Sequence, residues 1–173
     1  MVIIGDLRKT RQTVSNTRIG HGYDVHAFAE GDGFMLGGVH ISCARAIVAH
    51  SDGDVLIHAL CDALLGALGR GDIGQLFADD DARNENRDSR EFLREIKQLV
   101  DADNYRLGNA DLTIIAQAPK MAAHIAQMKD NLAQDLGCPS ASINVKATTT
   151  EGLGFIGREQ GIAVAAVVLL EQA

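Results

Sequence analysis

The spacing of hydrophobic residues predicts strands and helices that alternate along the chain. Residues 18–28, interrupted by two glycines, predict a strand, and residues 35–48 predict a glycine-containing hairpin. A helix is expected to open at residues 51–54, where hydroxyl and acidic side chains suit an N-terminus, and to end near Leu68. Its apolar positions are dense enough to predict almost complete burial: Val55, Ile57, Leu60, Leu64 and Leu65.

A second helix is predicted after a long loop. Residues 69–86 are rich in Gly and Asp and predict that loop. Asp88 and Glu91 then have the spacing of a capping box, so the helix is expected to start there. Its apolar face would consist of Phe92, Leu93, Ile96 and Val100.

The next segments predict two strands with a helix between them. Residues 110–117 predict a strand, and Pro119 suits the first position of a helix that Gly137 would end. The apolar stripe of this helix is Met121, Ile125, Met128 and Leu132. Residues 143–148 predict a short strand, and residues 149–160 predict a glycine-rich loop.

Residues 162–170 form a long apolar run that predicts the last strand. The run lacks polar alternation, so both faces of this strand are expected to be buried. One domain of 173 residues has little room for such a strand unless other subunits cover it, and we therefore expect an oligomer. With no internal repeat and no second domain, the pattern predicts a single α/β (α+β) domain.

Composition narrows the class of partner. A net charge of −7, with only five Phe, two Tyr and no Trp, argues against nucleic acid as the main partner. No apolar run approaches the roughly 18–20 residues that span a bilayer, so a membrane protein is not expected. An acidic protein that handles phosphates needs metals, helix N-termini or a few placed cations. Three cysteines without a Cys-x-x-Cys motif favour a reducing cytosol.

Residues 1–17 differ in character from the rest of the chain. Arg8, Lys9 and Arg11 lie among Ser, Thr and Asn, without the apolar core of a signal peptide. We expect a flexible N-terminal extension followed by one domain over residues 18–173. A truncated transit peptide and a linker left from a fused enzyme are the alternatives. A cytoplasmic location follows, or a plastid location if the extension is a transit-peptide remnant.

Asp24, His26 and His58 are candidate metal ligands. Asp24 and His26 lie two apart in a predicted strand and so point to one face, whereas His21 points away. His58 lies on the first predicted helix, and taken alone it is more often a core residue. Together the three match a catalytic zinc with an open fourth position. Asp62, one helical turn after His58, either orients that imidazole or is a surface charge.

A run of threonines suggests a phosphate site. Thr148, Thr149 and Thr150 follow a predicted strand and supply hydroxyl and backbone donors for phosphate oxygens. Glu151 would repel anions, and its place is explained if it holds a hard divalent cation between phosphates. A polar turn before a strand is the alternative.

Two further connections carry weaker signals. Residues 116–121 join a strand to a helix N-terminus, with Lys120 as a cation, but this is also an ordinary connection. Residues 71–74, followed by Phe77 and Asp79, offer carboxylates that suit polyol hydroxyls. A solvated acidic turn is the alternative for this segment.

These motifs occur together in one order along the chain. They are Arg-Ile-Gly-His-Gly-Tyr-Asp-Val-His at 18–26, Ala-His-Ser-Asp-Gly-Asp at 49–54, Gly-Asp-Ile-Gly at 71–74, Ala-Gln-Ala-Pro-Lys-Met at 116–121 and Lys-Ala-Thr-Thr-Thr-Glu at 146–151. In this combination the chain resembles the cyclodiphosphate synthase family of the non-mevalonate isoprenoid pathway. The resemblance covers about residues 18–170.

The resemblance implies a fold, an assembly and a reaction. It implies a homotrimer in which sheets face the three-fold axis, helices lie outside, and active sites lie between neighbouring subunits. The implied substrate is 4-diphosphocytidyl-2-C-methyl-D-erythritol 2-phosphate, whose 2-phosphate attacks the β-phosphorus to form a cyclic diphosphate and release CMP. A phosphate monoester is already ionised at neutral pH, so positioning and charge neutralisation are the tasks left to the protein.

The resemblance also implies roles for individual residues. Asp24, His26 and His58 would bind Zn²⁺, and Glu151 would bind a second divalent ion, Mg²⁺ or Mn²⁺; with Thr149 these residues would form the catalytic set. The CDP moiety would be held by Ala116, Pro119, Lys120, Met121, Thr148 and Thr149. The methylerythritol phosphate pocket would include His50, Ser51, Asp72, Phe77 and Asp79, and Phe155 and Arg158 would also bind substrate.

Three positions depart from the family pattern. Ala78 replaces a proline, and Gly152 stands where a lysine is expected after the glutamate. Ala165 replaces a glutamate that would pair with Arg158, so the family's hydrophobic axial channel is expected to differ here. Two other functions use the same residues: a zinc phosphodiesterase or nucleotide hydrolase with an activated water, and a non-catalytic, metal-stabilised trimer that binds nucleotides or isoprenoids.

Overall fold

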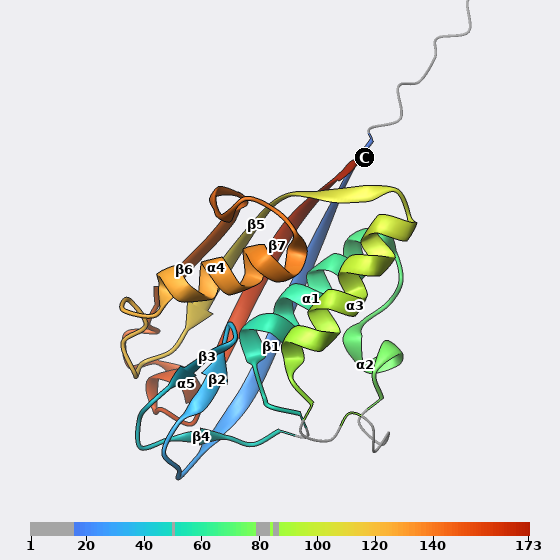
Figure 1. Ribbon diagram of the computed structural model, residues 1–173. Helices are drawn as coiled ribbons and strands as arrows, with labels where there is room; N and C mark the ends of the chain where they lie inside the picture. Colours follow the sequence, from blue (N-terminus) through green and yellow to red (C-terminus); the bar gives the residue numbers. More distant parts are fainter. Residues whose placement is uncertain (1–15, 50, 79–83, 85–86) are drawn as a thin grey trace, which may run out of the picture.

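The computed structural model describes residues 16–49, 51–78, 84 and 87–173, which form one mixed α/β domain as predicted (Figure 1). The strands are β1 Thr17–Ala29, β2 Phe34–Leu36, β3 Val39–Ile41, β4 Ala46–Ile47, β5 Tyr105–Ile115, β6 Ile143–Thr148 and β7 Gly161–Gln172. The helices are α1 Val55–Leu68, α2 Ile73–Leu76, α3 Ser89–Ala102, α4 Ile125–Leu136 and α5 Gly154–Gly157, with a short 3₁₀ helix, η2, at Ser140–Ser142.

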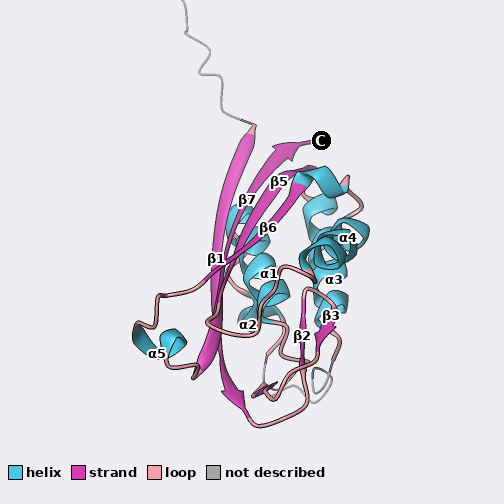
Figure 2. Cartoon of the chain, turned by 90° about the vertical axis from the view of Figure 1, so that its left-hand side faces the viewer, coloured by secondary structure: helices cyan, strands magenta, loops and turns pink. Residues whose placement is uncertain are grey.

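A five-stranded sheet in the order β4-β1-β7-β5-β6 carries the fold, while β2 and β3 pair separately. Strand β7 is antiparallel to both β1 and β5, and β6 is parallel to β5. Strands β1, β5 and β6 therefore run in one direction and end at the same edge of the sheet. Helices α1, α3 and α4 lie on one face of this sheet (Figure 2).

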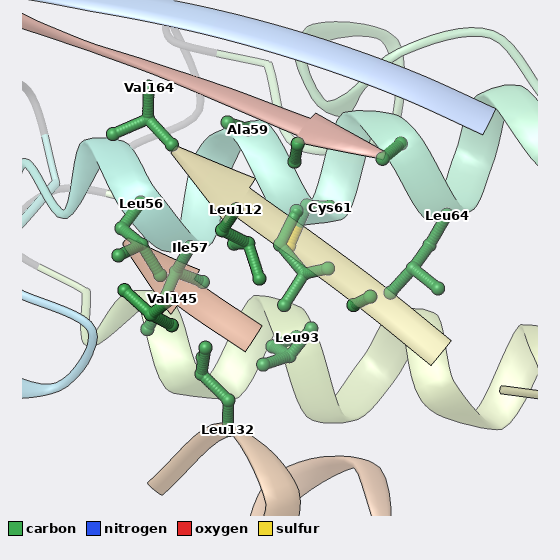
Figure 3. Close-up of a cluster of buried hydrophobic side chains, with 14 of the residues drawn as sticks. Leu56, Ile57, Ala59, Cys61, Leu64, Leu93, Leu112, Leu132, Val145 and Val164 are labelled. Atoms are coloured by element: carbon green, nitrogen blue, oxygen red, sulfur yellow. The ribbon is translucent and has the colours of Figure 1, made fainter. Parts of the chain in front are cut away.

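Helix α1 lies at the centre of the core. Residues at both of its ends fix where it begins and stops, and most of its side chains are buried. The Asp54 side chain accepts a hydrogen bond from the Ile57 N–H at the N-terminus, and Gly69 ends the helix in the left-handed conformation (φ 71°). The five apolar positions predicted to be buried are all buried. Figure 3 shows side chains of α1 packing with Leu93 of α3, Leu112 of β5 and Val164 of β7.

Two glycines of β1 allow α1 to lie directly on the strand. A Cβ atom built on Gly20 would lie 1.8 Å from the carbonyl oxygen of Ala63, and one built on Gly22 would lie 1.9 Å from that of Ala59. Any side chain at either position would push the helix away from the strand. The glycines that interrupt the predicted strand therefore set the distance between β1 and α1.

Several predicted boundaries are confirmed. The strand predicted at 18–28, the start and end of α1, and the strand at 143–148 agree with β1, α1 and β6. The hairpin predicted at 35–48 is present as β2 and β3, but its last part is β4, which pairs with β1 instead. Gly137 ends α4 in the left-handed conformation (φ 62°), as predicted.

Other predicted boundaries were wrong. Both predicted loops contain a four-residue helix, α2 and α5, because such short helices leave no periodic apolar pattern. Pro119 does not open a helix: α4 begins at Ile125, after a turn in which the His124 N–H donates to the Met121 carbonyl at 2.9 Å. Strand β5 begins at Tyr105, five residues before the predicted start.

The capping box predicted at the start of α3 forms only in part. The Asp88 side chain accepts from the Arg90 N–H, as an N-cap residue should. The Glu91 carboxylate, however, pairs with Arg87 at 2.8 Å, so it does not turn back to the Asp88 N–H. An ion pair with a neighbouring arginine replaces the expected second half of the motif.

Within one chain, strand β7 is buried on one face and partly exposed on the other, so the prediction that subunits cover its second face stays a prediction. Its helix-facing residues are Ile162, Val164, Ala166, Val168 and Leu170, all buried. On the opposite face Val167 is 44% exposed, and β1 adds Ile19, Tyr23 and Val25, at 72%, 51% and 40%. Within one chain the large helices cover a single face, so this apolar surface faces solvent (Figure 2).

The described chain includes only the end of the predicted N-terminal extension. Asn16 accepts a hydrogen bond from the Gln172 N–H at 2.9 Å, and Thr17 lies opposite Glu171 in the sheet. Residues 1–15 lie outside the described residues, so the predicted flexible extension stays a prediction. In the part of the chain that the structure describes, no helix has the length and apolar character that crossing a membrane requires.

Candidate active site

Asp24, His26 and His58 meet where β1 is covered by the first turns of α1. Asp24 and His26 lie on the face of β1 that carries Gly20 and Gly22. His58 belongs to α1, which packs on that face. The Asp24 Oδ2 atom is 3.0 Å from the Nε2 atom of His26 and 3.2 Å from the Nδ1 atom of His58. The other carboxylate oxygen accepts from the Val25 N–H at 2.8 Å, which orients the group.

The three donor atoms fit a divalent metal ion. They all lie within 4.8 Å of one another. Ligand atoms about 2.0–2.1 Å from a tetrahedral zinc lie about 3.3 Å apart, close to the two shortest distances here. Two imidazole nitrogens and one carboxylate oxygen also suit zinc chemically, and they leave a fourth position open. The predicted triad is therefore present and has the geometry of a metal site.

Electrostatics keep Asp24 charged at this site. Burial raises its pKa, but hydrogen bonds from His26 and His58 and the charges of those rings together hold the pKa well below its usual range. Burial lowers the pKa of His58, whereas its hydrogen bond with Asp24 and the charge of Asp24 raise it, and the net direction is upward. In the absence of metal, the site therefore favours a proton on His58 opposite the Asp24 carboxylate.

A cavity of about 350 Å³ opens beside the triad. Its walls come from β1, from the loop that precedes α1, from α1 and α2, and from the first turn of α3. It is lined by Asp24, Val25, His26, Ala27, Val48, Ala49, Ser51, His58, Asp62, Ile73, Gly74, Phe77, Asn84 and Phe92. Its volume suits a small ligand.

Ser51 and Phe77, both predicted to contact substrate, line this cavity. Phe77 packs on Phe92, with ring centroids 4.6 Å apart, and the Arg87 guanidinium lies over both rings. Phe92, predicted only as a core residue, therefore also forms a wall of the site. Asp72, also predicted to contact substrate, is the N-cap of α2, where its carboxylate accepts from the Gln75 N–H at 2.9 Å.

Two more residues predicted for this pocket, His50 and Asp79, lie outside the described residues. Asp62 lines the cavity but does not hydrogen-bond the imidazole of His58, which corrects that expectation. Its Oδ1 atom accepts from the Ile73 N–H at 2.8 Å, so Asp62 fixes the start of α2. Burial raises the pKa of this carboxyl, and the hydrogen bond from Ile73 opposes the rise.

The residues predicted to hold nucleotide gather at the ends of β5 and β6. The Ala116 N–H donates to the Thr148 carbonyl at 3.0 Å and so joins the two strand ends. The Thr149 hydroxyl donates to the Glu151 carboxylate at 3.0 Å, and Glu151 adopts a left-handed backbone (φ 52°). Met121 is buried beside this cluster, whereas Lys120 is exposed. Pro119 follows a cis peptide bond.

One chain does not bring the nucleotide cluster to the metal triad. Strand β7 lies between β1 and β5, so the two groups are separated by about 10 Å or more along the sheet. None of residues 116–121 or 148–151 lines the cavity. Phe155 lies in α5, and Arg158 follows it and contacts Gln160 at 3.3 Å; both are also away from the cavity.

Ser89 is a site residue that the sequence did not suggest. It is fully buried, and its Oγ atom lies 2.9 Å from the Nε2 atom of His58. Ser89 donates its backbone N–H and its hydroxyl to the carboxylate of Asp52, which was predicted only as part of the start of α1. The only signal for Ser89 was its position at the start of a predicted helix. Nothing in that pattern indicates a contact with a residue 31 positions earlier.

The pKa of His58 gives a testable result for the metal-free protein. An NMR titration should find the pKa of His58 raised above its usual value, and Asp24→Asn should lower it, because burial then acts without the hydrogen bond and charge of Asp24. A raised folded-state pKa stabilises the fold fully below pH 6.5, and this stabilisation is lost as the pH rises through the raised value. An unchanged pKa in the variant would show that Asp24 is not the partner.

Comparisons with known proteins find relatives over most of the chain. The chain is 61% identical over 158 residues to the 2-C-methyl-D-erythritol 2,4-cyclodiphosphate synthase of Thioalkalivibrio sulfidiphilus, covering 91% of this chain and 99% of that one. A structure described as a CDP complex of IspF from Plasmodium falciparum matches with a TM-score of 0.80 and 37% identity, over 92% and 99% of the two chains.

A further solved structure is that of the bifunctional IspDF from Campylobacter jejuni. It matches with a TM-score of 0.87 and 44% identity, over 91% of this chain and 42% of that longer one. Residues 17–171 match the YgbB family. The resemblance drawn from the motifs is therefore confirmed, and the chain belongs to the YgbB family of cyclodiphosphate synthases.

Proposed function

We propose that this chain converts 4-diphosphocytidyl-2-C-methyl-D-erythritol 2-phosphate to 2-C-methyl-D-erythritol 2,4-cyclodiphosphate and CMP. The observation that carries the proposal is the Asp24, His26 and His58 triad at a cavity of about 350 Å³. Relatives that are about 60% identical over nearly their whole length have the same enzyme name. The described chain offers donors for one metal ion and a cavity beside them.

The reaction requires little acid–base chemistry from the protein. The attacking 2-phosphate is ionised at neutral pH, so the side chains must position it and balance charge. Asp24, His26 and His58 would hold Zn²⁺, and Glu151 would hold Mg²⁺ or Mn²⁺; bound there, the ions would polarise the phosphates and neutralise developing charge. Ser51 lines the cavity beside the triad and can donate its hydroxyl to a phosphate oxygen.

The nucleotide would be held by the cluster at the ends of β5 and β6. Thr148, Thr149 and the backbone near Ala116 present hydroxyl and amide groups there, and Lys120 is exposed beside them. Thr149 already donates to Glu151, which would keep the carboxylate ready for a cation. Asp72, Phe155 and Arg158 stay proposed substrate contacts, together with His50 and Asp79.

We further propose a homotrimer whose active sites lie between subunits. Two observations support it: the apolar, partly exposed face of the sheet, and the separation of the metal triad from the nucleotide cluster within one chain. A neighbouring copy that packs on the exposed face would cover Ile19, Tyr23 and Val167. It would also bring its own nucleotide cluster toward the triad. The cytoplasmic or plastid location stays a prediction.

Phosphorus NMR of the purified protein with the proposed substrate, Zn²⁺ and Mg²⁺ tests the activity. Two coupled cyclic-diphosphate resonances that appear together with CMP are the expected result. CMP with only a linear phosphate product would move the assignment to a hydrolase. A protein that binds Zn²⁺ and CDP but releases no CMP would be a binding protein and would overturn the proposal.

Shared active sites predict complementation between two inactive variants. Asp24→Asn damages the triad and Glu151→Gln damages the proposed second ion site, so each homotrimer should be inactive. Mixed trimers should regain activity, because about one site in three would join an intact Asp24 to an intact Glu151 of the next subunit. Co-expressed, differently tagged chains provide the mixed species. Mixed trimers as inactive as both parents would place both residues of a site in one chain.

A further inference from the structure

A line of hydrogen bonds continues from His58 away from the metal triad. The Nε2 atom of His58 lies 2.9 Å from the Oγ atom of Ser89, which is fully buried at the start of α3. The Ser89 hydroxyl in turn bonds to the Oδ1 atom of Asp52, and the Ser89 backbone N–H donates to the Oδ2 atom at 3.1 Å. Asp52, Ser89 and His58 therefore form a line of hydrogen bonds through three separate segments.

The direction of each hydrogen bond in this line follows from the donors available. The Asp52 carboxylate can only accept, and its Oδ1 atom also receives the Asp54 N–H at 3.1 Å. The single hydroxyl proton of Ser89 must then point to Asp52. The Ser89 oxygen is left as an acceptor for His58, so the proton of the imidazole belongs on Nε2.

That arrangement leaves the other ring nitrogen for the metal. With the proton on Nε2, the Nδ1 atom of neutral His58 has a free lone pair, and this is the nitrogen that lies 3.2 Å from Asp24. Ser51 also approaches Nε2, but at 3.3 Å, and its oxygen receives the Gly53 N–H as well. Ser89 is the closer and the fully buried partner.

We propose that Asp52 and Ser89 are positioning residues that fix the tautomer and orientation of His58 for metal binding. The proposal rests on the proposed metal site at Asp24, His26 and His58. Partners of this kind hold the ring of a metal-bound histidine in many proteins, and their loss weakens metal binding about 10–100-fold. Here the partner is a hydroxyl whose own direction is set by a carboxylate.

The same contacts also fasten the start of α3, so a test must separate the two effects. Asp52 receives the Ser89 N–H, and its own N–H donates to the Arg87 carbonyl at 3.2 Å. Asp88, next to Ser89, provides a matched control because it caps α3 through the Arg90 N–H and, among the described residues, makes no hydrogen bond with His58. Asp88→Ala therefore weakens the helix start alone.

Zn²⁺ affinity, measured by competition with a chelator, is the first readout. Ser89→Ala is expected to bind Zn²⁺ about 10–100-fold more weakly than the unmodified chain, at an unchanged stoichiometry. Asp88→Ala should lower the unfolding midpoint but leave the Zn²⁺ affinity unchanged. Asp52→Asn should also weaken Zn²⁺ binding, because either orientation of the amide places its NH₂ group against the backbone N–H of Asp54 or Ser89.

NMR of the Zn²⁺-loaded protein, labelled with ¹⁵N in histidine, is the second readout. The Nε2 proton of His58 should be hydrogen-bonded and slow to exchange in the unmodified chain, and it should exchange faster in Ser89→Ala. An unmodified chain that binds no Zn²⁺ would defeat the proposed metal site itself. Normal Zn²⁺ binding by Ser89→Ala with an unchanged Nε2 proton would defeat only this inference. Equal weakening in Asp88→Ala would also overturn it, since the effect would then come from the helix start.

Discussion

Asp24→Asn is expected to abolish tight Zn²⁺ binding and to lower CMP release by at least about a thousandfold, or about 4 kcal/mol. The change keeps the size of the side chain but removes its charge. In the structure the Asp24 Oδ2 atom is 3.0 Å from the Nε2 atom of His26 and 3.2 Å from the Nδ1 atom of His58, so this one oxygen contacts both imidazoles. Without it, two neutral imidazoles would remain to hold a dication in a partly buried site.

Asp101→Asn is the matched control for this prediction. Asp101 lies on the exposed side of α3 and pairs with Lys97 at 2.6 Å, an interaction worth little at a surface. Its Zn²⁺ affinity and turnover should equal those of the unmodified chain. Metal content, chelator competition and CMP release are measured on both variants. Full turnover in a folded Asp24→Asn variant would exclude the triad as the catalytic metal site.

Gly22→Ala is expected to give the largest loss of stability, about 3 kcal/mol or more in the free energy of unfolding. Its Cβ atom would lie 1.9 Å from the backbone oxygen of Ala59, which cannot move without moving α1. A shifted α1 would also carry His58 away from Asp24. We therefore expect both a lower denaturation midpoint and weaker Zn²⁺ binding from the addition of a single methyl group.

Gly66→Ala makes the same chemical change within α1 and serves as the control. Its Cβ atom would have one neighbour within 4 Å, the His21 carbonyl oxygen at 3.8 Å, which is an ordinary contact. Replacing glycine in a helix interior should then stabilise the protein by up to about 1 kcal/mol. Urea unfolding of both variants provides the comparison. Equal midpoints for the two would show that α1 is not held by close contact at Gly22.

The parts of the fold that could be predicted are those with a repeated local signal. The apolar run of α1 between Asp54 and Gly69 identified the helix and both of its ends. Helices α2 and α5 could not be predicted, because one turn gives no periodicity. The start of α2 also depends on Asp62, a side chain from α1. The apolar run of β7 predicted two covered faces, and one chain covers only one of them, because an apolar sequence does not say which chain supplies the cover.

Some residues of the candidate site could likewise be predicted from a local pattern, and others could not. Asp24 and His26 could be predicted because a spacing of two in a strand places both side chains on one face. His58 could be proposed from its helix, but its distance from Asp24 depends on Gly20 and Gly22, whose role is visible only once the helix is placed. Ser89 and Phe92 reach the site from α3 through contacts distant in sequence, which no local pattern encodes.

The pairing of β1 with β7 also decides where another protein could be attached. Thr17 lies opposite Glu171, so both ends of the folded domain emerge side by side (Figure 1). Asp24 is seven residues further along β1, roughly 23 Å away at the usual rise of a strand. A tag, a surface anchor or a fused enzyme joined at either end would therefore leave the mouth of the cavity free for diffusing substrate.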